Sequence, residues 1–492
     1  MLFNSWQFLL FFPIVLLLYY VLPVKFRRVW LLVCSLFFYA CWNVKYLLLL
    51  IASILITYFT AILTERFGNK RKTLMIIGLI ADFSLLVFFK YSGFLLNIIK
   101  DIADKFNVPG PGLSFDILLP VGISFYVFQS AGYLIDVYRG DIKAERNIVR
   151  YALFVSFFPQ LVAGPIERSK NMLSQIDEMV NEKKPDFDRL RSGFICIMWG
   201  LFLKLVAADR LAVLADEVFD RYYSYGTFIL ILGAAAFSLQ IYCDFASYST
   251  IAAGSAEMLG FTLMENFETP YFSRSIREFW RRWHISLSTW FRDYLYIPLG
   301  GNRCSKIRQY VNIMITFLVS GLWHGADWSF VFWGGLHGLY QILGDIIKPV
   351  RDRLESFFHT DRESFGYKLS EMMITTALAV FAWIFFRAPS IGNAFSYIGR
   401  MFTHFDPWTL TDKSIYTLGL DVTEMHVLWA SLLVILCVGI LRYKRRIRID
   451  RFICSQGGLF RAVTVYLLIM AVIIYGKYGP SEELKAFLYF RF

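Results

Sequence analysis

The stretch that decides the fold reads TFILILGAAAFSLQIYCDFASYSTIA and covers residues 227–252. It contains one charged side chain, Asp244, and it is long enough to cross the hydrocarbon core of a bilayer as a helix. A soluble domain can bury much apolar surface, but it rarely does so in an unbroken run of this length. The stretch therefore predicts a transmembrane helix.

Runs of the same kind recur along the chain of 492 residues, because 57% of the residues are hydrophobic and only 18% are charged. The candidate segments, some of them short enough to be tilted, broken or re-entrant, are 6–23, 29–42, 45–64, 73–89, 117–137, 193–213, 227–252, 310–323, 328–347, 371–388, 424–441 and 461–479. We therefore expect an all-α integral membrane protein. Its architecture would be a polytopic bundle of about 11–12 apolar segments, including re-entrant or interfacial helices.

No linker rich in Ser, Gly or Pro divides these segments, so we expect a single membrane domain. Its expected parts are peripheral N-terminal helices in 1–100, a motif core at about 120–345 and C-terminal helices in 370–492, within a domain of 1–492. The first apolar run lacks a basic segment before it and a small-residue cleavage site after it. We expect a retained helix there and not a cleaved signal peptide.

The formal net charge of +12 follows the membrane topology and does not suggest a nucleic-acid partner. Basic residues gather in short loops between apolar runs, at 25–28, 66–72 and 443–451, as the positive-inside rule predicts for cytoplasmic loops. The N-terminus is then expected outside. Some of this charge is also expected to attract anionic membrane lipids or an anionic substrate.

One short apolar segment, Tyr151–Gly164, carries basic residues on both flanks and ends at Gly164-Pro165. This pattern favours a segment that enters the membrane and returns, while a short crossing with a weak charge signal is the alternative. Non-helical backbone at membrane depth requires cover by protein or a water-filled cavity. We therefore expect this segment to be enclosed by other helices.

The seven cysteines are odd in number and lie mostly inside apolar runs, without a CxxC pair or a metal-like Cys/His spacing. This argues against a disulfide framework or a zinc site, and we expect no metal. Motifs of soluble enzymes, such as GxSxG, GxGxxG, the P-loop and HExxH, are also absent from the sequence.

The strongest catalytic candidate is His324, which lies in SGLWHGADW (320–328) between two apolar runs. An ionisable group inside a membrane is costly and usually faces a bundle interior or an aqueous cavity. A neutral imidazole there can accept a proton from a hydroxyl group near neutral pH. The alternative is a packed, hydrogen-bonded structural histidine. Asp327 could orient His324, but its spacing favours the water interface.

His337, in WGGLHG (333–338), has a simpler interpretation, because Gly334 and Gly338 form a pair of small residues four apart. Such a pair lets two helices approach closely, so we favour a structural role for His337 over a role in the lining of a tunnel.

His284 lies in FWRRWHISLSTWFR (279–292), where the periodicity predicts one amphipathic helix near the membrane interface. Its tryptophans would share one face and its arginines the flank. The helix is either an interfacial anchor with arginines on lipid phosphates, or it lines the route of an anionic acyl donor with Arg281, Arg282 and Arg292.

Asp244 is a candidate for function because it is a carboxylate inside an apolar run, and a buried ion pair with an arginine from 274–282 is the alternative. Its neighbour Cys243 could serve as an acyl nucleophile, but a buried cysteine is usually part of the packing.

Four stretches resemble the membrane-bound O-acyltransferase family, and in particular the bacterial branch typified by the membrane subunit of alginate O-acetyltransferase. They are PVGISFYVFQSAGYLIDVYRG (120–140), FFPQLVAGPIER (157–168), ENFETPYFSRSIREFWRRWHISLSTWFRDYLYIPLGGNR (265–303) and GLWHGADWSFVFWGGLHG (321–338). They stand in the family's order. Two positions depart from the pattern: Thr250 replaces a second acid after Asp244, so it receives no role, and Asp327 replaces a residue that is commonly small.

The resemblance implies that His324 is the essential histidine and that His284 occupies the second motif position. Trp323, Asp244 and His337 are further candidates for donor binding or for the lining of a tunnel. It also implies a central funnel that joins a cytoplasmic donor side to an extracytoplasmic acceptor side. No bound cofactor is implied, and the donor substrate would be acetyl-CoA or the thioester of an acyl carrier protein. An SGNH-hydrolase-like extracytoplasmic transferase is the usual partner that finishes acetylation of the polysaccharide.

We therefore expect a multi-pass enzyme of the bacterial inner membrane that O-acetylates an exported or cell-surface polysaccharide. His324 would be the general base, and His284 is a candidate donor to the tetrahedral oxyanion. Two alternatives remain: D-alanyl transfer to teichoic acid, and a transporter of polysaccharide or lipid, which would share the hydrophobicity and the buried ionisable groups.

Overall fold

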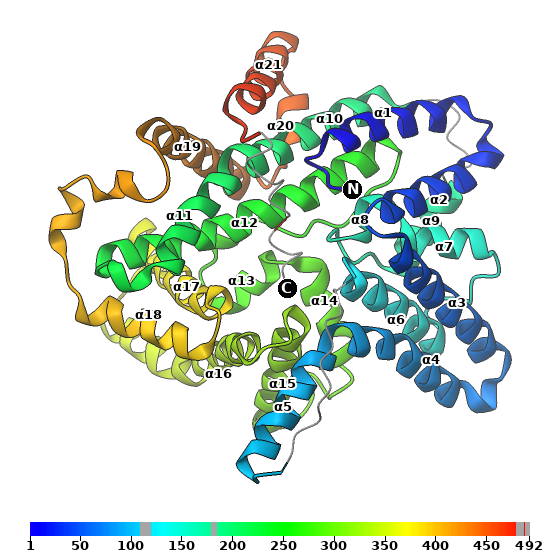
Figure 1. The fold of residues 1–492 in the computed structure, drawn as a ribbon, viewed down its shortest axis with the longest axis horizontal. Coiled ribbons are helices and arrows are strands. Elements are labelled where there is room, and N and C mark those ends of the chain that lie inside the picture. Colours follow the sequence, from blue (N-terminus) through cyan, green and yellow to red (C-terminus); the bar gives the residue numbers. More distant parts are fainter. Residues whose placement is uncertain (109–119, 179–184, 479–486, 488–492) are drawn as a thin grey trace. The chain divides into compact units, whose positions relative to one another are not determined.

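The computed structural model describes residues 1–108, 120–178, 185–478 and 487, and these residues are almost entirely helical (Figure 1). Extended pairing among them is limited to one isolated bridge between Phe267 and Trp283. Within the described residues, seven helices are long and apolar enough to cross a membrane: Val44–Arg66, Gly68–Lys105, Phe187–Asp220, Thr227–Met258, Phe365–Arg387, Val422–Arg445 and Gly458–Tyr475. The expected all-α, polytopic membrane architecture is confirmed.

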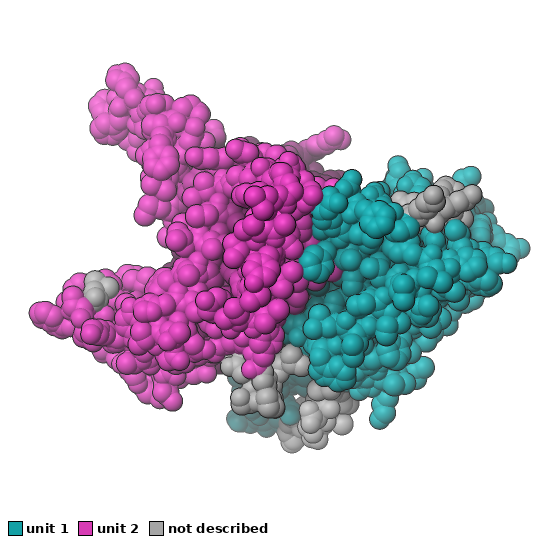
Figure 2. Space-filling model, turned by 90° about the horizontal axis from the view of Figure 1, so that it is seen from above, with its two compact units in different colours: residues 1–194, 251–264, 492 teal, residues 195–250, 265–491 magenta. Residues whose placement is uncertain are grey.

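The chain divides into two compact units, which Figure 2 distinguishes by colour. Unit 1 comprises 1–194 and 251–264, and unit 2 comprises 195–250 and 265–491. The helices of unit 1 are α1 (Trp6–Val21), α2 (Val24–Ala40), α3 (Val44–Arg66), α4 (Arg71–Leu86), α5 (Ser92–Lys105), α6 (Ile123–Arg139), α7 (Ile148–Ser156), α8 (Phe158–Leu161) and α9 (Ser169–Glu178). The start of the expected segment 117–137 lies outside the described residues, and the remainder forms α6.

Unit 2 holds the residues with candidate functions. Its helices are α11 (Asp209–Asp220), α13 (Ile276–Arg282), α14 (Ile285–Phe291), α15 (Lys306–His324), α16 (Trp328–Phe357), α17 (Phe365–Arg387), α18 (Ile391–Thr403), α19 (Val422–Arg445), α20 (Ile449–Cys454) and α21 (Gly458–Tyr475). The division between the units falls within α10 (Phe187–Leu201) and α12 (Thr227–Met258). A π-helical segment, Phe202–Ala208, continues α10 into α11.

The segment Tyr151–Gly164 of unit 1 is broken, as its sequence indicated. Residues 151–156 lie in α7 and residues 158–161 form the four-residue α8, and residues 151–164 are all buried. With a rise of about 1.5 Å per residue, a helix as short as α7 cannot cross a hydrocarbon core of about 30 Å. The segment is therefore not a regular spanning helix, and its re-entry from the cytoplasmic side stays a prediction.

The prediction of one continuous amphipathic helix through His284 is wrong. The chain forms α13 and α14 with a break at Trp283 and His284, where His284 takes the left-handed conformation (φ 44°, ψ 54°). Helical periodicity reports which faces are apolar, but it does not detect a long-range contact that interrupts the helix. Here the contact is the bridge between Phe267 and Trp283.

Candidate active site

His324 is the last residue of α15, at a sharp turn into α16. Gly325 follows in an extended conformation, and the Asp327 carboxylate caps α16 by accepting a hydrogen bond of 2.8 Å from the backbone N–H of Ser329. Asp327 is exposed and His324 is only 5% exposed. The structure therefore assigns Asp327 to helix capping and places the His324 imidazole in the interior of unit 2.

Two glycines near this turn, Gly321 and Gly334, allow α15 and α16 to pack closely together. A Cβ atom on Gly321 would lie 2.2 Å from the carbonyl oxygen of Phe330, and one on Gly334 would lie 2.2 Å from that of Phe317. Only glycine allows backbones to approach so closely. This explains the small residues of both motifs and fixes the direction in which His324 points.

His284 reaches the interior because the chain breaks between α13 and α14. Asn266 stabilises the break: its backbone carbonyl accepts from the N–H of Ile285 at 3.0 Å, and its side-chain oxygen accepts from the Ser286 hydroxyl at 2.6 Å. A left-handed conformation costs a non-glycine residue about 1–3 kcal/mol and is found preferentially at functional sites. In this left-handed conformation the His284 imidazole is fully buried within unit 2.

The two histidines meet inside an aromatic cluster. Their ring centroids lie 6.4 Å apart, and Trp323 lies 4.9 Å from His324 and 6.1 Å from His284. Trp333 and Phe386 complete the surroundings of His324 at 5.1 and 5.6 Å. Residues that are 40 positions apart in the chain are thus brought together, with apolar rings that reduce the local dielectric and strengthen any hydrogen bond made there.

Burial lowers the pKa of the His284 imidazole to about 3, so this ring is neutral near pH 7. His284 lies between α13 and α14, outside the candidate membrane spans. A neutral imidazole carries one N–H donor and one acceptor nitrogen. Such a donor, fixed by a strained backbone, suits stabilisation of a developing oxyanion without a change of charge on the enzyme.

His337 also belongs to this aromatic cluster, where it contacts Trp333 and Trp280. It is fully buried on α16, its ring lies 5.0 Å from that of Trp333, and its Nδ1 accepts a hydrogen bond of 3.3 Å from Trp280 Nε1. The neighbouring Gly338 packs closely against Met314 and Phe317 of α15. The glycines therefore serve helix packing, and His337 contacts the tryptophan of α13.

A cavity of about 1110 Å³ lies between α13, α14, α15 and α16 of unit 2. Its lining combines apolar side chains with one acidic residue, Asp345, which pairs with Arg277 at 2.7 Å, and with five basic ones: Arg277, Arg281, Arg292, Lys306 and Lys348. The volume is at the upper end of what small-molecule sites require. A lining of this kind suits a ligand with an apolar part and several negative charges.

The three arginines assigned to the donor route from the sequence differ in their positions. Arg281 and Arg292 line the cavity, and Arg281 has no ion pair within the described part of the chain. Arg282 does not line the cavity. It is 6% exposed, pairs with Glu278 at 2.7 Å and donates to Thr269 at 3.2 Å. Arg281 therefore lies in the cavity, whereas its neighbour Arg282, which the sequence also assigned to the donor route, does not.

Asp244 forms a buried ion pair, but its partner is not an arginine of 274–282. Lys204 Nζ lies 2.7 Å from Asp244 and 3.0 Å from Asp209, and all three side chains are buried. The expected partner is therefore corrected to Lys204, in the π-helical segment that continues α10. The Phe245 ring next to Asp244 packs against His284 at 4.6 Å, which connects this ion pair to the site.

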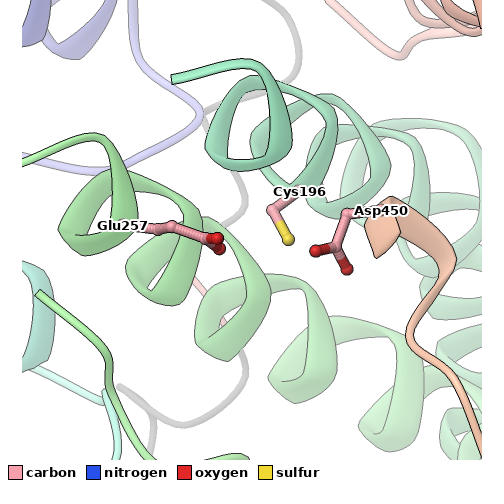
Figure 3. Close-up of side chains that lie close together, drawn as sticks. All are labelled: Cys196, Glu257 and Asp450. Carbon is pink, nitrogen blue, oxygen red and sulfur yellow. The ribbon is translucent and has the colours of Figure 1, made fainter. Parts of the chain in front are cut away.

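Cys243 is fully buried beside Asp244. A second cysteine, Cys196, lies with its sulfur within 4.8 Å of a carboxylate oxygen of Asp450 (Figure 3). Arg448 donates to the Cys196 sulfur at 2.9 Å and pairs with Asp450 at 3.0 Å. The Arg448 guanidinium therefore accounts for both groups, through an ion pair with Asp450 and a hydrogen bond to the Cys196 sulfur.

Sequence reasoning missed two residues that shape the site. Lys204 could have been found, because a single lysine inside an apolar run of the membrane carries the same signal as Asp244. The sequence around Asn266 does not mark this residue as functional. Asn266 stabilises the break at His284 through hydrogen bonds to Ser286, 20 positions later, and a local sequence pattern does not reveal such a contact.

Comparisons with known proteins identify the family of the chain. Residues 144–385 match the family model described as MBOAT, the membrane-bound O-acyltransferase family. The probable alginate O-acetylase AlgI of Pseudomonas syringae pv. tomato is 38% identical over 88% of this chain and 81% of its own length. The peptidoglycan O-acetyltransferase of Helicobacter pylori is 36% identical over 82% and 80%. The teichoic acid D-alanyltransferase of Streptococcus thermophilus is 31% identical over 53% and 64%.

Proposed function

The chain belongs to the membrane-bound O-acyltransferase family and is a membrane-embedded O-acyltransferase, and from this premise we propose its substrates and mechanism. It transfers an acetyl group from a thioester donor on the cytoplasmic side to a hydroxyl group of an exported or cell-surface polysaccharide. Relatives that this chain matches over most of its length are named for O-acetylation of alginate and of peptidoglycan, which supports a polysaccharide as the acceptor.

The observation that carries this proposal is the meeting of His284 and His324, 6.4 Å apart, next to a basic cavity. The donor, acetyl-CoA or the thioester of an acyl carrier protein, binds in that cavity near Arg281 and Arg292. Lys306 and Lys348, toward the basic ends of α15 and α16, support entry from the cytoplasmic side, where the positive-inside rule places such residues.

In the reaction, His324 accepts the proton of the acceptor hydroxyl while the oxygen attacks the thioester carbonyl carbon. The tetrahedral oxyanion accepts a hydrogen bond from the neutral His284. When the intermediate collapses, the carbon–sulfur bond breaks and the thiolate takes the proton from His324. The products are an ester and a free thiol, and the proton balance needs no metal or redox cofactor.

We place the enzyme in the cytoplasmic membrane of a bacterium, with its acceptor side facing outward and lipid around its apolar helices. The acceptor is either a sugar hydroxyl or a serine of an SGNH-hydrolase-like extracytoplasmic transferase that relays the acetyl group. This arrangement accounts for a donor that is made inside the cell and a polymer that is modified outside it.

A second candidate, D-alanyl transfer to teichoic acid, is favoured by one observation, the 31% identity to a teichoic acid D-alanyltransferase. That match covers 53% of this chain, much less than the matches to the O-acetylating relatives. Family membership favours an enzyme over the transporter that the sequence left open. A transporter would also tolerate the loss of His324.

The experiment that tests the proposal compares His324→Ala with His404→Ala, a substitution of an exposed histidine, in cells that produce the polymer. Loss of a general base should lower polymer O-acetyl content about 10²-fold or more. The His404 variant should retain normal content. Both are normalised to the amount of protein in the same membranes. Normal acetylation by a well-expressed His324→Ala protein would exclude the mechanism.

A further inference from the structure

The basic cavity stops short of His324. It follows α15 from Lys306 to Ser320, and His324 lies one helical turn beyond Ser320. Neither His324 nor His284 lines it. A donor that fills the cavity as it stands does not reach the two histidines.

Trp280 lies at this inner boundary and lines the cavity together with Phe317 and Ser320. Its ring lies 5.3 Å from that of Phe317 and 5.7 Å from that of Trp333. Trp333 in turn contacts His324 at 5.1 Å. Trp280 and Trp333 therefore form a continuous aromatic contact between the cavity and His324.

His337 holds Trp280 in this position. The hydrogen bond from Trp280 Nε1 to His337 Nδ1 is 3.3 Å long and buried. Because His337 accepts at Nδ1, its ring is neutral and its proton is on Nε2. A single hydrogen bond of this length is weak enough to break during a catalytic cycle, yet it biases the tryptophan toward one rotamer.

The chemistry requires that this boundary open. The attacking oxygen must approach the thioester carbonyl to about 3–3.5 Å, and the base must lie within about 3.2 Å of the hydroxyl. With Trp280 in place the carbonyl stays in the cavity. With Trp280 displaced, both the carbonyl and any water from the acceptor side could meet at His324.

We infer that Trp280 is a gate between the donor cavity and the catalytic histidines and that His337 is the positioning residue that latches it closed. The inference rests on the proposed donor cavity. The closed gate protects the thioester from hydrolysis, in which water adds to the carbonyl carbon and the carbon–sulfur bond breaks, releasing acetic acid and the free thiol. The gate thereby couples cleavage of the donor to the presence of an acceptor.

Three variants of the full chain in lipid vesicles test the gate, with acetyl-CoA as the probe and release of free thiol without acceptor as the readout. His337→Phe removes the acceptor nitrogen but keeps a ring, and Trp280→Phe removes the donor N–H. His337→Asn keeps an acceptor oxygen near the position of Nδ1. We expect the first two to release thiol about two- to tenfold faster than the unmodified chain, the factor for one lost hydrogen bond. The Asn variant should stay near the unmodified rate.

Unchanged thiol release by both His337→Phe and Trp280→Phe would overturn the gate, and so would equal release by the Phe and Asn variants of His337. If one Phe variant does not fold, the other removes the same hydrogen bond from its opposite end. Failure of the gate is distinguishable from failure of the proposed function. The second would appear as polymer acetylation in cells that does not depend on His324.

Discussion

Replacing Lys204 with methionine should destabilise the protein strongly, because it leaves two carboxylates in the interior without their cation. Lys204 lies 2.7 Å from Asp244 and 3.0 Å from Asp209, and its side chain is 2% exposed. Removing one partner of a buried ion pair typically costs about 3–5 kcal/mol, since the remaining charge has lost both water and its counter-ion. Methionine has a similar length, so loss of packing contributes little.

The assay is unfolding of the purified protein by a denaturing detergent in mixed micelles, which gives a free energy of unfolding. Lys204→Met should lower this free energy by about 3–5 kcal/mol. Combining it with Asp209→Asn and Asp244→Asn should recover much of the loss, because the two carboxylate charges that faced Lys204 are then removed as well. Lys348→Met, which breaks an exposed pair with Asp352, is the matched control and should have no resolvable effect.

The reasoning would be refuted if Lys204→Met unfolded like the unmodified chain. It would also be refuted if the triple variant were no more stable than the single one. The first result would mean that Asp209 and Asp244 do not carry charge in the folded protein, and the second that the lysine stabilises unit 2 in some other way.

Three further predictions follow from the structure. Arg281→Gln should raise the apparent KM for the donor, because Arg281 lines the cavity. Arg282→Gln should instead lower the amount of folded protein, because the buried Arg282 side chain pairs with Glu278. Steady-state kinetics and membrane protein levels distinguish the two effects, and a raised KM in the Arg282 variant alone would contradict this division. Gly334→Ala should cost about 1–3 kcal/mol in the same unfolding assay, since its Cβ meets a backbone oxygen, while Gly344→Ala, with open space around it, should cost nothing measurable. A cysteine at position 70 should resist an impermeant thiol reagent added to intact cells, and strong labelling would reverse the proposed orientation.

The class of the protein follows from its sequence because it depends on local composition. Long apolar runs favour transmembrane helices whatever their neighbours are. Candidate spans such as Val44–Arg66 and Thr227–Met258 can therefore be located from hydropathy and length alone. The sequence made His324 a candidate for a related reason. An imidazole between two apolar runs can be recognised in the sequence alone. The glycines near it predict the close contact between α15 and α16 that the structure contains.

The arrangement of the site was decided by contacts between distant segments. The segment around His284 has a helical pattern, yet it breaks because Phe267 pairs with Trp283 and Asn266 binds the following turn. Asp244 pairs with Lys204 because helices 40 residues apart in the chain pack together. Local periodicity fixes which face of a segment is apolar, but hydrogen bonds and ion pairs between segments depend on the packing of the whole unit, and in this protein they determine which side chains reach the histidines.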